Sequence, residues 1–464
     1  MKQFTKFLPG FNKLCGRAPK SKVAEAVRAI KEIREGLPGQ LAHVFGGAIP
    51  AEAIPLAEGG RRRVYDTRTT FWAFQGQILR GGSLREAVRE VQAGRERRGL
   101  DPVSENTAAY CEARARLPQG VVDEVHEKLC RRLEAECRRP GRRVLAVDGS
   151  SAQLADTPAN QLEYPQPSTQ QPGCGWPVMQ AVGLYDLDTG ALLRVADSAQ
   201  TDHEASWFQV DLIDSVREED IVLTDRGFCS FLNFGLILER GADALSRLHA
   251  GRKLPFKGRQ NECVVTWERP PLNKMPPHLL PEQWERLPET ITVRYIRFRI
   301  EEKGFRTREV VLATTLLEVP AGELIELHRR RWEIELCLRD IKTTLGMEWI
   351  PCKSPAMARK QLSMYLIAHN LIRWLMQRAA RGAGQPPRRL SFKGALDAAL
   401  RWMPELHAMV ASRRKNAFAE LLRTIAADLL PDRPGRFEPR RQKTRPKFSF
   451  LSKPRREYSP QGHA

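Results

Sequence analysis

The sequence lacks a long hydrophobic run, a paired cysteine motif and an internal repeat. No apolar stretch in its 464 residues approaches the length of about 18 residues that a membrane-spanning helix needs. Its nine cysteines are odd in number and scattered, and the sequence has no Cys-x2-Cys or His-x3-5-His pair. These absences argue against a membrane protein and against a zinc protein, and they predict a cytoplasmic chain with reduced thiols.

Acidic residues are few compared with basic ones. The chain has 75 Lys and Arg against 55 Asp and Glu, which gives a formal net charge of +20 and a pI near 9.8. Such an excess indicates either a polyanionic partner or a solvated basic surface. Because arginines cluster within residues 328–342, where a candidate site lies, we favour nucleic acid and expect the protein to act on chromosomal or plasmid DNA.

The segment from His328 to Lys342 is the most informative part of the chain. At about 100° per residue, one helical face would carry His328, Arg331, Glu335 and Lys342. An apolar stripe beside that face predicts one continuous helix that packs on a sheet and ends near Gly346. On the charges alone, an exposed amphipathic helix with ion pairs four residues apart is the better interpretation.

Two aspartates at the ends of apolar strands change that interpretation. Asp148 ends the run 144–148, and Asp225 follows the run 221–224. The intervening residues predict a two-stranded hairpin over 178–196 and then a helix over 203–216. This order predicts a ribonuclease-H-like α/β core, in which the first and fourth strands are neighbours and bring the two aspartates together. Either aspartate alone would more commonly be a turn or cap residue.

Two neighbouring carboxylates repel each other unless a cation offsets their charge. Oxygen ligands of this kind suit Mg²⁺ or Mn²⁺, which keep some waters and bind substrate phosphates. Two such ions can activate a water or a 3′-hydroxyl and stabilise the leaving oxygen at phosphorus. We therefore expect Asp148, Asp225 and Glu335 to form an acidic set that holds two metal ions.

At these residues the chain resembles the DDE transposases of the insertion-sequence-4 family. The family signature is Tyr-x2-Arg-x3-Glu-x6-Lys, and the matching positions are His328, Arg331, Glu335 and Lys342. The regions 147–160 and 224–228 are also similar to the family, and the resemblance spans about residues 142–355. The chain departs from the signature at His328, where the family has tyrosine.

The resemblance implies a transposase that cuts DNA at the ends of an insertion sequence and joins the freed ends to target DNA. It implies that Asp148, Asp225 and Glu335 are the catalytic metal-binding triad. The candidate DNA contacts in the core are His328, Arg331, Lys342 and Arg226. A homodimer on paired DNA ends is also implied. Two alternatives stay open, namely a catalytically inactive DNA-binding relative, which His328 favours, and a ribonuclease-H-like nuclease that cuts without joining.

We expect a catalytic core flanked by helical regions. Residues 1–140 have helical patterns, and a helix-turn-helix there would present Asn106, Thr107, Tyr110 and Arg114 to DNA. A plain helical packing domain fits that pattern equally well, although the resemblance implies binding of terminal inverted repeats. The predicted core covers 141–350, a second helical region covers 351–430, and a basic tail covers 431–464, with ten Lys or Arg against three acids. We expect that tail to be disordered until it meets DNA.

Strand-like runs separate Asp225 from Glu335, and they predict a β-subdomain inserted at about 235–315. The insertion contains Trp267. Some family members use an aromatic residue of this insertion to hold a flipped DNA base, so Trp267 is a candidate for that role. A large aromatic residue in a strand is more often a packing residue.

Overall fold

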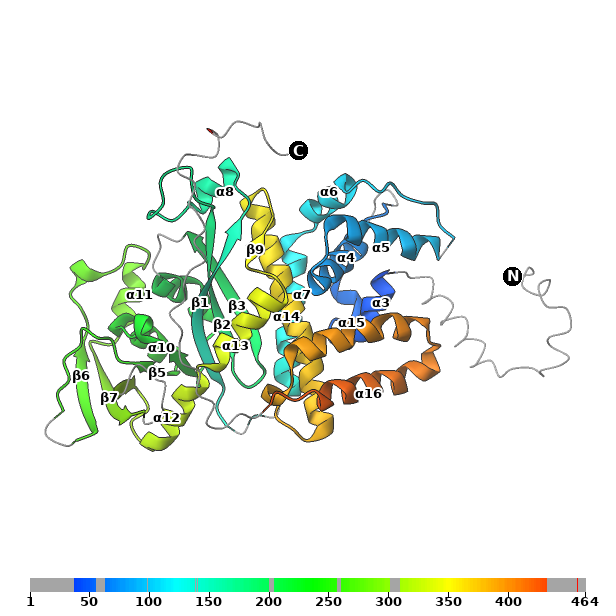
Figure 1. Ribbon diagram of the computed structural model, residues 1–464. Coiled ribbons are helices and arrows are strands. Elements are labelled where there is room, and N and C mark those ends of the chain that lie inside the picture. Colours follow the sequence, from blue (N-terminus) through cyan, green and yellow to red (C-terminus); the bar gives the residue numbers. More distant parts are fainter. Residues whose placement is uncertain are drawn as a thin grey trace, which may run out of the picture.

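The chain forms a sheet-containing half and a helical half, which lie side by side in the computed structural model (Figure 1). The long helix α14 (Pro355–Ala383) runs between the two halves. The structure describes residues 37–55, 63–97, 99–137, 139, 141–199, 204–256, 260–300, 309–431 and 457. The predicted basic tail over 431–464 lies outside the described residues, except for Pro431 and Glu457.

The strands of the described residues form one sheet in the order β3-β2-β1-β4-β5-β8-β7-β6, with β9 paired to β1. The β1–β2 and β2–β3 pairs are antiparallel, whereas the β1–β4 and β4–β5 pairs are parallel. This is the ribonuclease-H-like arrangement, and the predicted fold class is confirmed. The strands are β1 (Val144–Leu154), β2 (Val178–Asp186), β3 (Ala191–Ala199), β4 (Ile221–Thr224), β5 (Asp243–Arg247), β6 (Glu262–Glu268), β7 (Thr290–Arg299), β8 (Glu309–Thr314) and β9 (Trp349–Ile350).

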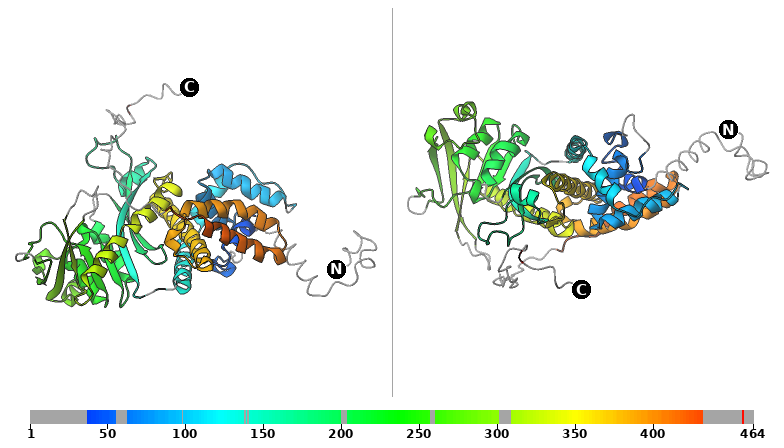
Figure 2. Two further views of the ribbon diagram at one scale, coloured as in Figure 1. Left: turned by 60° about the horizontal axis from the view of Figure 1, so that its bottom comes forward. Right: turned by 90° about the horizontal axis from the view of Figure 1, so that it is seen from above.

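Helices cover both faces of the parallel part of the sheet (Figure 2). Because successive side chains of a strand point to opposite faces, Val144 and Ala146 belong to one hydrophobic cluster and Leu145 and Val147 to another. The first cluster includes residues of α14, and the second includes residues of the helical turn η3 (Phe208–Leu212) and of α10 (Phe231–Glu239). Burial on both faces explains why this part of β1 is apolar without alternation.

Strands β6, β7 and β8 extend the central sheet. They fall within the predicted insertion at about 235–315. Strand β8 joins them to the central sheet, because it pairs antiparallel with β5. Strand β5 also lies entirely within those limits, although it belongs to the parallel part of the sheet. Trp267 is 3% exposed, and its indole N–H donates a 2.8 Å hydrogen bond to the Tyr295 hydroxyl. The packing interpretation of Trp267 is therefore the one that the structure supports.

The helical half is organised around α14. Helices from both ends of the described chain pack on α14, among them α4, α7, α15 and α16. The regions predicted at 1–140 and 351–430 thus share one hydrophobic core along this helix. Within the described residues, no helix is long and apolar enough to cross a membrane. The helices of this half are α3 (Leu37–Phe45), α4 (Thr67–Arg80), α5 (Leu84–Glu96), α6 (Ala108–Arg116), α7 (Gln119–Glu136), α15 (Phe392–Ala408) and α16 (Ala411–Ala427).

Candidate active site

The strand that carries Asp148 continues beyond it. The sequence predicts that this strand ends at Asp148, but β1 runs on to Leu154 because β2 pairs with it along its length. The parallel pairing with β4 stops earlier, at Ala146 and Leu223. Asp148 and Asp225 each follow that pair by two positions, so the register brings them to the same edge of the sheet.

Asp225 is held in a defined conformation directly after β4. Its carboxylate accepts a 2.7 Å hydrogen bond from the backbone N–H of Gly227, in the 3₁₀ turn η5 (Arg226–Phe228). Its backbone carbonyl accepts a 2.8 Å bond from the Ser246 hydroxyl of β5. The side chain is half-buried, while the neighbouring Arg226 is exposed. Asp225 is thus a cap residue whose carboxylate is also near the surface, where a ligand can reach it.

The basic segment is helical but interrupted. It consists of α12 (Ala321–Arg330), α13 (Glu333–Arg339) and the π-helical turn η7 (Asp340–Thr344), instead of the single helix predicted. Between α12 and α13 the backbone N–H groups of Arg331 and Glu335 bond to carbonyls three residues earlier, at 3.1 Å each. Such tight turns inside helices are frequent at functional sites. A sequence period does not reveal them, because an interruption of a single turn is too short to change the spacing of the apolar residues.

Asp148 lies near enough to both other predicted acids to interact with them electrostatically. Burial raises the pKa of Asp148 above its ordinary value, and the negative charges of Asp225 and Glu335 raise it further. The Gly149 backbone N–H and the Arg331 guanidinium oppose these effects. Arg331 Nη1 lies 3.8 Å from Asp148 Oδ2. Asp148 and Asp225 are half-buried, and Glu335 is exposed on the first turn of α13.

Arg247 joins this group, and the sequence analysis missed it. Thr224 of β4 pairs with Ser246 of β5. Asp225 and Arg247 each come directly after this last pair, so both lie at the same end of the two strands. Burial lowers the pKa of Arg247, as do the charges of Arg226 and Arg331, while Asp225 acts in the opposite direction. One signal was available, because the short run Ala244-Leu245-Ser246 is followed by a charged residue, as the apolar runs before Asp148 and Asp225 are.

His328 is close enough to Arg331 and Arg247 to feel their charges. It is 9% exposed, and its Nε2 atom has no hydrogen-bond partner among the described residues. Burial lowers its pKa to about 4, and the charges of Arg331 and Arg247 add to that shift. The other predicted basic residue of this helix, Lys342, is half-buried in η7.

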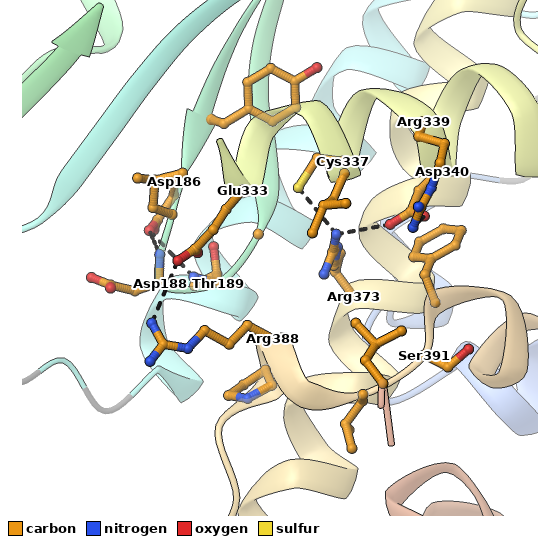
Figure 3. Close-up of a pocket in the computed structure, with 18 of the residues that line it drawn as sticks. Asp186, Asp188, Thr189, Glu333, Cys337, Arg339, Asp340, Arg373, Arg388 and Ser391 are labelled. Carbon is orange, nitrogen blue, oxygen red and sulfur yellow. Dashed lines mark hydrogen bonds and ion pairs between the residues drawn. The ribbon is translucent and has the colours of Figure 1, made fainter. Parts of the chain in front are cut away.

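A separate cavity of about 220 Å³ lies against α13, and Glu335 does not line it (Figure 3). Arg373 of α14 points into the wall between Cys337 and Asp340, and its Nη2 lies 3.1 Å from each of the two side chains. Arg388 Nη1 lies 3.5 Å from a carboxylate oxygen of Glu333. Burial raises the pKa of Asp340 to about 6. These ion pairs attach α13 and η7 to the C-terminal helices. Asp148, Asp225 and Glu335 do not line the cavity, so it is separate from the acidic group.

The structure corrects two predicted DNA contacts in the N-terminal helical region. Tyr110 is fully buried, and Arg114 is 6% exposed and donates a 3.0 Å hydrogen bond to the Gln361 side chain of α14. The prediction for these two residues is wrong, because the face of α6 that carries both packs inside the helical half. Asn106 is exposed and Thr107 is half-buried, just before α6 begins.

The donor chemistry at the acidic group fits a divalent cation. No three His, Cys, Asp or Glu side chains of the described part of the chain are close enough to hold a metal ion by themselves. Mg²⁺, however, is commonly bound by one or two carboxylates together with waters and substrate phosphates. Asp148 and Asp225 supply two carboxylates at one sheet edge, and their mutual repulsion raises the pKa of Asp148. A bound cation would remove that repulsion.

Residues 139–371 match the sequence family described as transposase DDE domain. The chain belongs to this family. The predicted membership is confirmed, and the chain is a DDE transposase, an enzyme that cleaves and transfers DNA. Enzymes of this family use divalent metal ions.

The transposase is similar to a curated relative along most of its length. It is 27% identical over 432 residues to "Transposase InsG for insertion sequence element IS4" of Escherichia coli (strain K12), which covers 87% of this chain and 92% of the relative. A solved structure, "Cryo-EM structure of piggyBac transposase synaptic complex with hairpin DNA (SNHP)", aligns with a TM-score of 0.43 and 9% identity. That alignment covers 88% of this chain and 86% of the other.

Proposed function

We propose that Asp148, Asp225 and Glu335 are the catalytic carboxylates with which this transposase cuts DNA at the ends of its insertion sequence and joins them to target DNA. The supporting observation is that Asp148 interacts electrostatically with both other acids, although the three come from β1, from the residue after β4 and from α13. Joining of a freed 3′-hydroxyl to a target phosphodiester is a transesterification, which depends mainly on positioning and charge neutralisation.

The same three residues would hold two Mg²⁺ ions, for which Mn²⁺ can substitute. Their oxygen-only ligand set supports this proposal. When bound, such ions neutralise charge and activate the attacking oxygen. The carboxylates must then be ionised, so Arg331, which lowers the pKa of Asp148, keeps Asp148 ready to bind a cation. Glu335 is exposed and completes the set from the helix side.

The basic residues around the acids would bind the DNA backbone. Arg331 lies 3.8 Å from Asp148, Arg247 interacts electrostatically with Asp225, and Arg226 is exposed beside Asp225. Arginine binds phosphates through several N–H groups at once, so these residues would position the scissile phosphate. His328 and Lys342 are the remaining candidates for this role.

We further propose a division of labour along the chain. The helical region up to residue 140 would bind the terminal inverted repeats, with Asn106 and Thr107 as its candidate contacts. Residues 141–350 would be the catalytic core, with an insertion at about 235–315, and 351–430 a helical region that supports it. Two copies would assemble on paired DNA ends. The enzyme would act in the cytoplasm on chromosomal or plasmid DNA.

The test is strand cleavage by the full-length protein. Purified transposase is incubated with a linear duplex that carries the two element ends, with Mg²⁺ or with EDTA, and the strands are separated on a denaturing gel. We expect nicked and joined products that need Mg²⁺. Glu335→Gln should retain DNA binding and lower the cleavage rate by more than about a hundredfold. Removal of a metal ligand should lower the activity more than removal of a residue that only hydrogen-bonds to such a ligand.

Glu326→Gln is the matched control, because Glu326 is an exposed carboxylate of the same basic segment whose ion pair with Arg329 is also exposed. It should cleave like the wild type. Cleavage by Glu335→Gln at the wild-type rate would refute the assignment of Glu335. Nicks without joined products would favour a nuclease, and binding without any cleavage would favour an inactive relative.

A further inference from the structure

Two neighbouring arginines at the end of α12 contact different carboxylates. Arg331 Nη1 lies 3.8 Å from Asp148 Oδ2, on β1. Arg330 Nη2 donates a 2.9 Å hydrogen bond to Asp188 Oδ1, in the turn between β2 and β3. Glu335 follows these arginines on the first turn of α13. Both ion pairs therefore lie just before the tightened turn that leads to Glu335.

Asp188 belongs to the same rigid sheet as Asp148. Its turn is fixed, because the Asp186 carboxylate accepts hydrogen bonds of 3.0 and 3.4 Å from the backbone N–H groups of Asp188 and Thr189. The strand before this turn, β2, pairs antiparallel with β1 along a stretch that includes Asp148. The position of Asp188 relative to Asp148 is therefore set by the hydrogen bonds of the sheet.

The ion pair of Arg330 with Asp188 is more enclosed than a surface ion pair. The two side chains are 21% and 12% exposed, respectively. Arg139 Nε lies 3.5 Å from the other carboxylate oxygen of Asp188, and Arg330 Nε donates a 3.4 Å hydrogen bond to Glu333, the first residue of α13. Because water screens enclosed charges less than exposed ones, this contact holds Arg330 in one direction.

Metal binding makes this contact the decisive one. Arg331 and a cation at Asp148 carry charge of the same sign and repel each other, so the ion pair of Arg331 with Asp148 weakens when a cation binds. Ile334 and Cys337 are buried and still pack α13 on the core, but apolar contacts have no preferred direction. A charge-assisted hydrogen bond has one. The contact of Arg330 with Asp188 thus fixes the rotation of the turn that carries Glu335.

We propose that Asp188 is a positioning residue that, through Arg330, places the Glu335 carboxylate where it shares a metal ion with the other two acids. The inference rests on the proposed function, because it takes Glu335 to be a metal ligand. Asp188→Asn and Arg330→Gln should then weaken metal binding alike, although they remove charges of opposite sign. By charge alone, Arg330→Gln would strengthen the binding of a cation, since it removes a positive charge.

The experiment measures the dissociation constant of Mn²⁺ alone for the full-length protein, from the loss of the electron paramagnetic resonance signal of the free ion. Wild type is compared with Asp188→Asn, with Arg330→Gln and with the double variant. Asp243→Asn is the matched control, because Asp243 is also a half-buried carboxylate and pairs with Arg142 at 2.7 Å instead of with a residue of α12 or α13. Glu335→Gln tests the metal ligand itself.

We expect each single variant of the Arg330 pair to bind Mn²⁺ about tenfold more weakly than the wild type, at the low end of the range for residues that support metal ligands. The double variant should bind no more weakly than the weaker single variant, because both changes break one interaction. Asp243→Asn should bind like the wild type. The Mg²⁺ concentration for half-maximal DNA cleavage should rise in the same order, whereas a loss of stability alone would lower the folded fraction without moving it.

Wild-type Mn²⁺ affinity in both single variants would overturn the proposal, as would tighter binding by Arg330→Gln, which would show that only its charge matters. If Asp188→Asn does not fold, Arg330→Gln decides the question by the sign of its effect. If Glu335→Gln weakens Mn²⁺ binding but the variants of the ion pair do not, only this inference fails. If Glu335→Gln binds Mn²⁺ like the wild type, the proposed metal ligand fails together with it.

Discussion

Replacement of Asp220 by alanine should lower the free energy of unfolding by about 3 kcal/mol, at the low end of the range for breaking a buried ion pair. Asp220 precedes β4, and Arg143 precedes β1. Their side chains are 3% and 7% exposed, and the guanidinium and carboxylate form two hydrogen bonds of 2.8 and 2.5 Å. Without Asp220, the guanidinium stays charged and buried. The low end applies because Arg143 keeps a 3.1 Å bond to the Ser215 carbonyl and an approach of 3.7 Å to Glu134.

Urea unfolding of the full-length protein provides the measurement, with Arg143→Met, Asp220→Ala and the double variant Arg143→Met/Asp220→Leu beside the wild type. Each single variant should be destabilised, and the double variant should recover most of the loss, because apolar pairs often replace buried ion pairs without cost. Destabilisation by Asp220→Ala of less than about 1 kcal/mol would refute the reasoning. DNA cleavage per folded molecule should not change, since the pair lies just before the paired part of β1 and β4, whereas Asp148 and Asp225 follow it.

Three further predictions concern single residues. Arg331→Ala should raise the pKa of Asp148, because Arg331 lowers it, so the acidic limb of the pH–cleavage profile should move to higher pH; an unmoved limb would contradict this. Gly183→Ala should lower the unfolding free energy by about 1–3 kcal/mol in urea, since the added Cβ would lie 2.8 Å from the Tyr185 ring. Arg114→Ala should cost about 1–3 kcal/mol but leave the DNA affinity of the folded protein unchanged, and weaker binding at full folding would restore Arg114 as a DNA contact.

The acidic group was predictable because its signals are local. Each aspartate follows an apolar run, and the order of strand, hairpin, helix and strand makes the first and fourth strands neighbours. The spacing of His328, Arg331 and Glu335 could be read directly. Arg247 was not found because its place depends on the register of β5 against β4, and register is a property of paired strands.

The N-terminal prediction failed for a related reason. Tyr110 and Arg114 are four residues apart and share one face of α6, as residues of a DNA-reading helix would. A sequence pattern shows that residues share a face, but it does not show what covers that face. Here Arg114 meets Gln361, which lies 247 positions further along the chain. Only the packing of α14 against the N-terminal helices turned this face into core.

The sequence by itself determined the ribonuclease-H-like order of strands, the family and the three candidate carboxylates, because apolar runs, turn residues and motif spacing act over short distances along the chain. The tertiary structure alone decided that β1 continues past Asp148, that the basic helix tightens at Arg331, and that Arg247 and Arg331 are close enough to His328 to act on its charge. These features depend on strand register, hydrogen-bond spacing and burial, which exist only once distant segments have packed together.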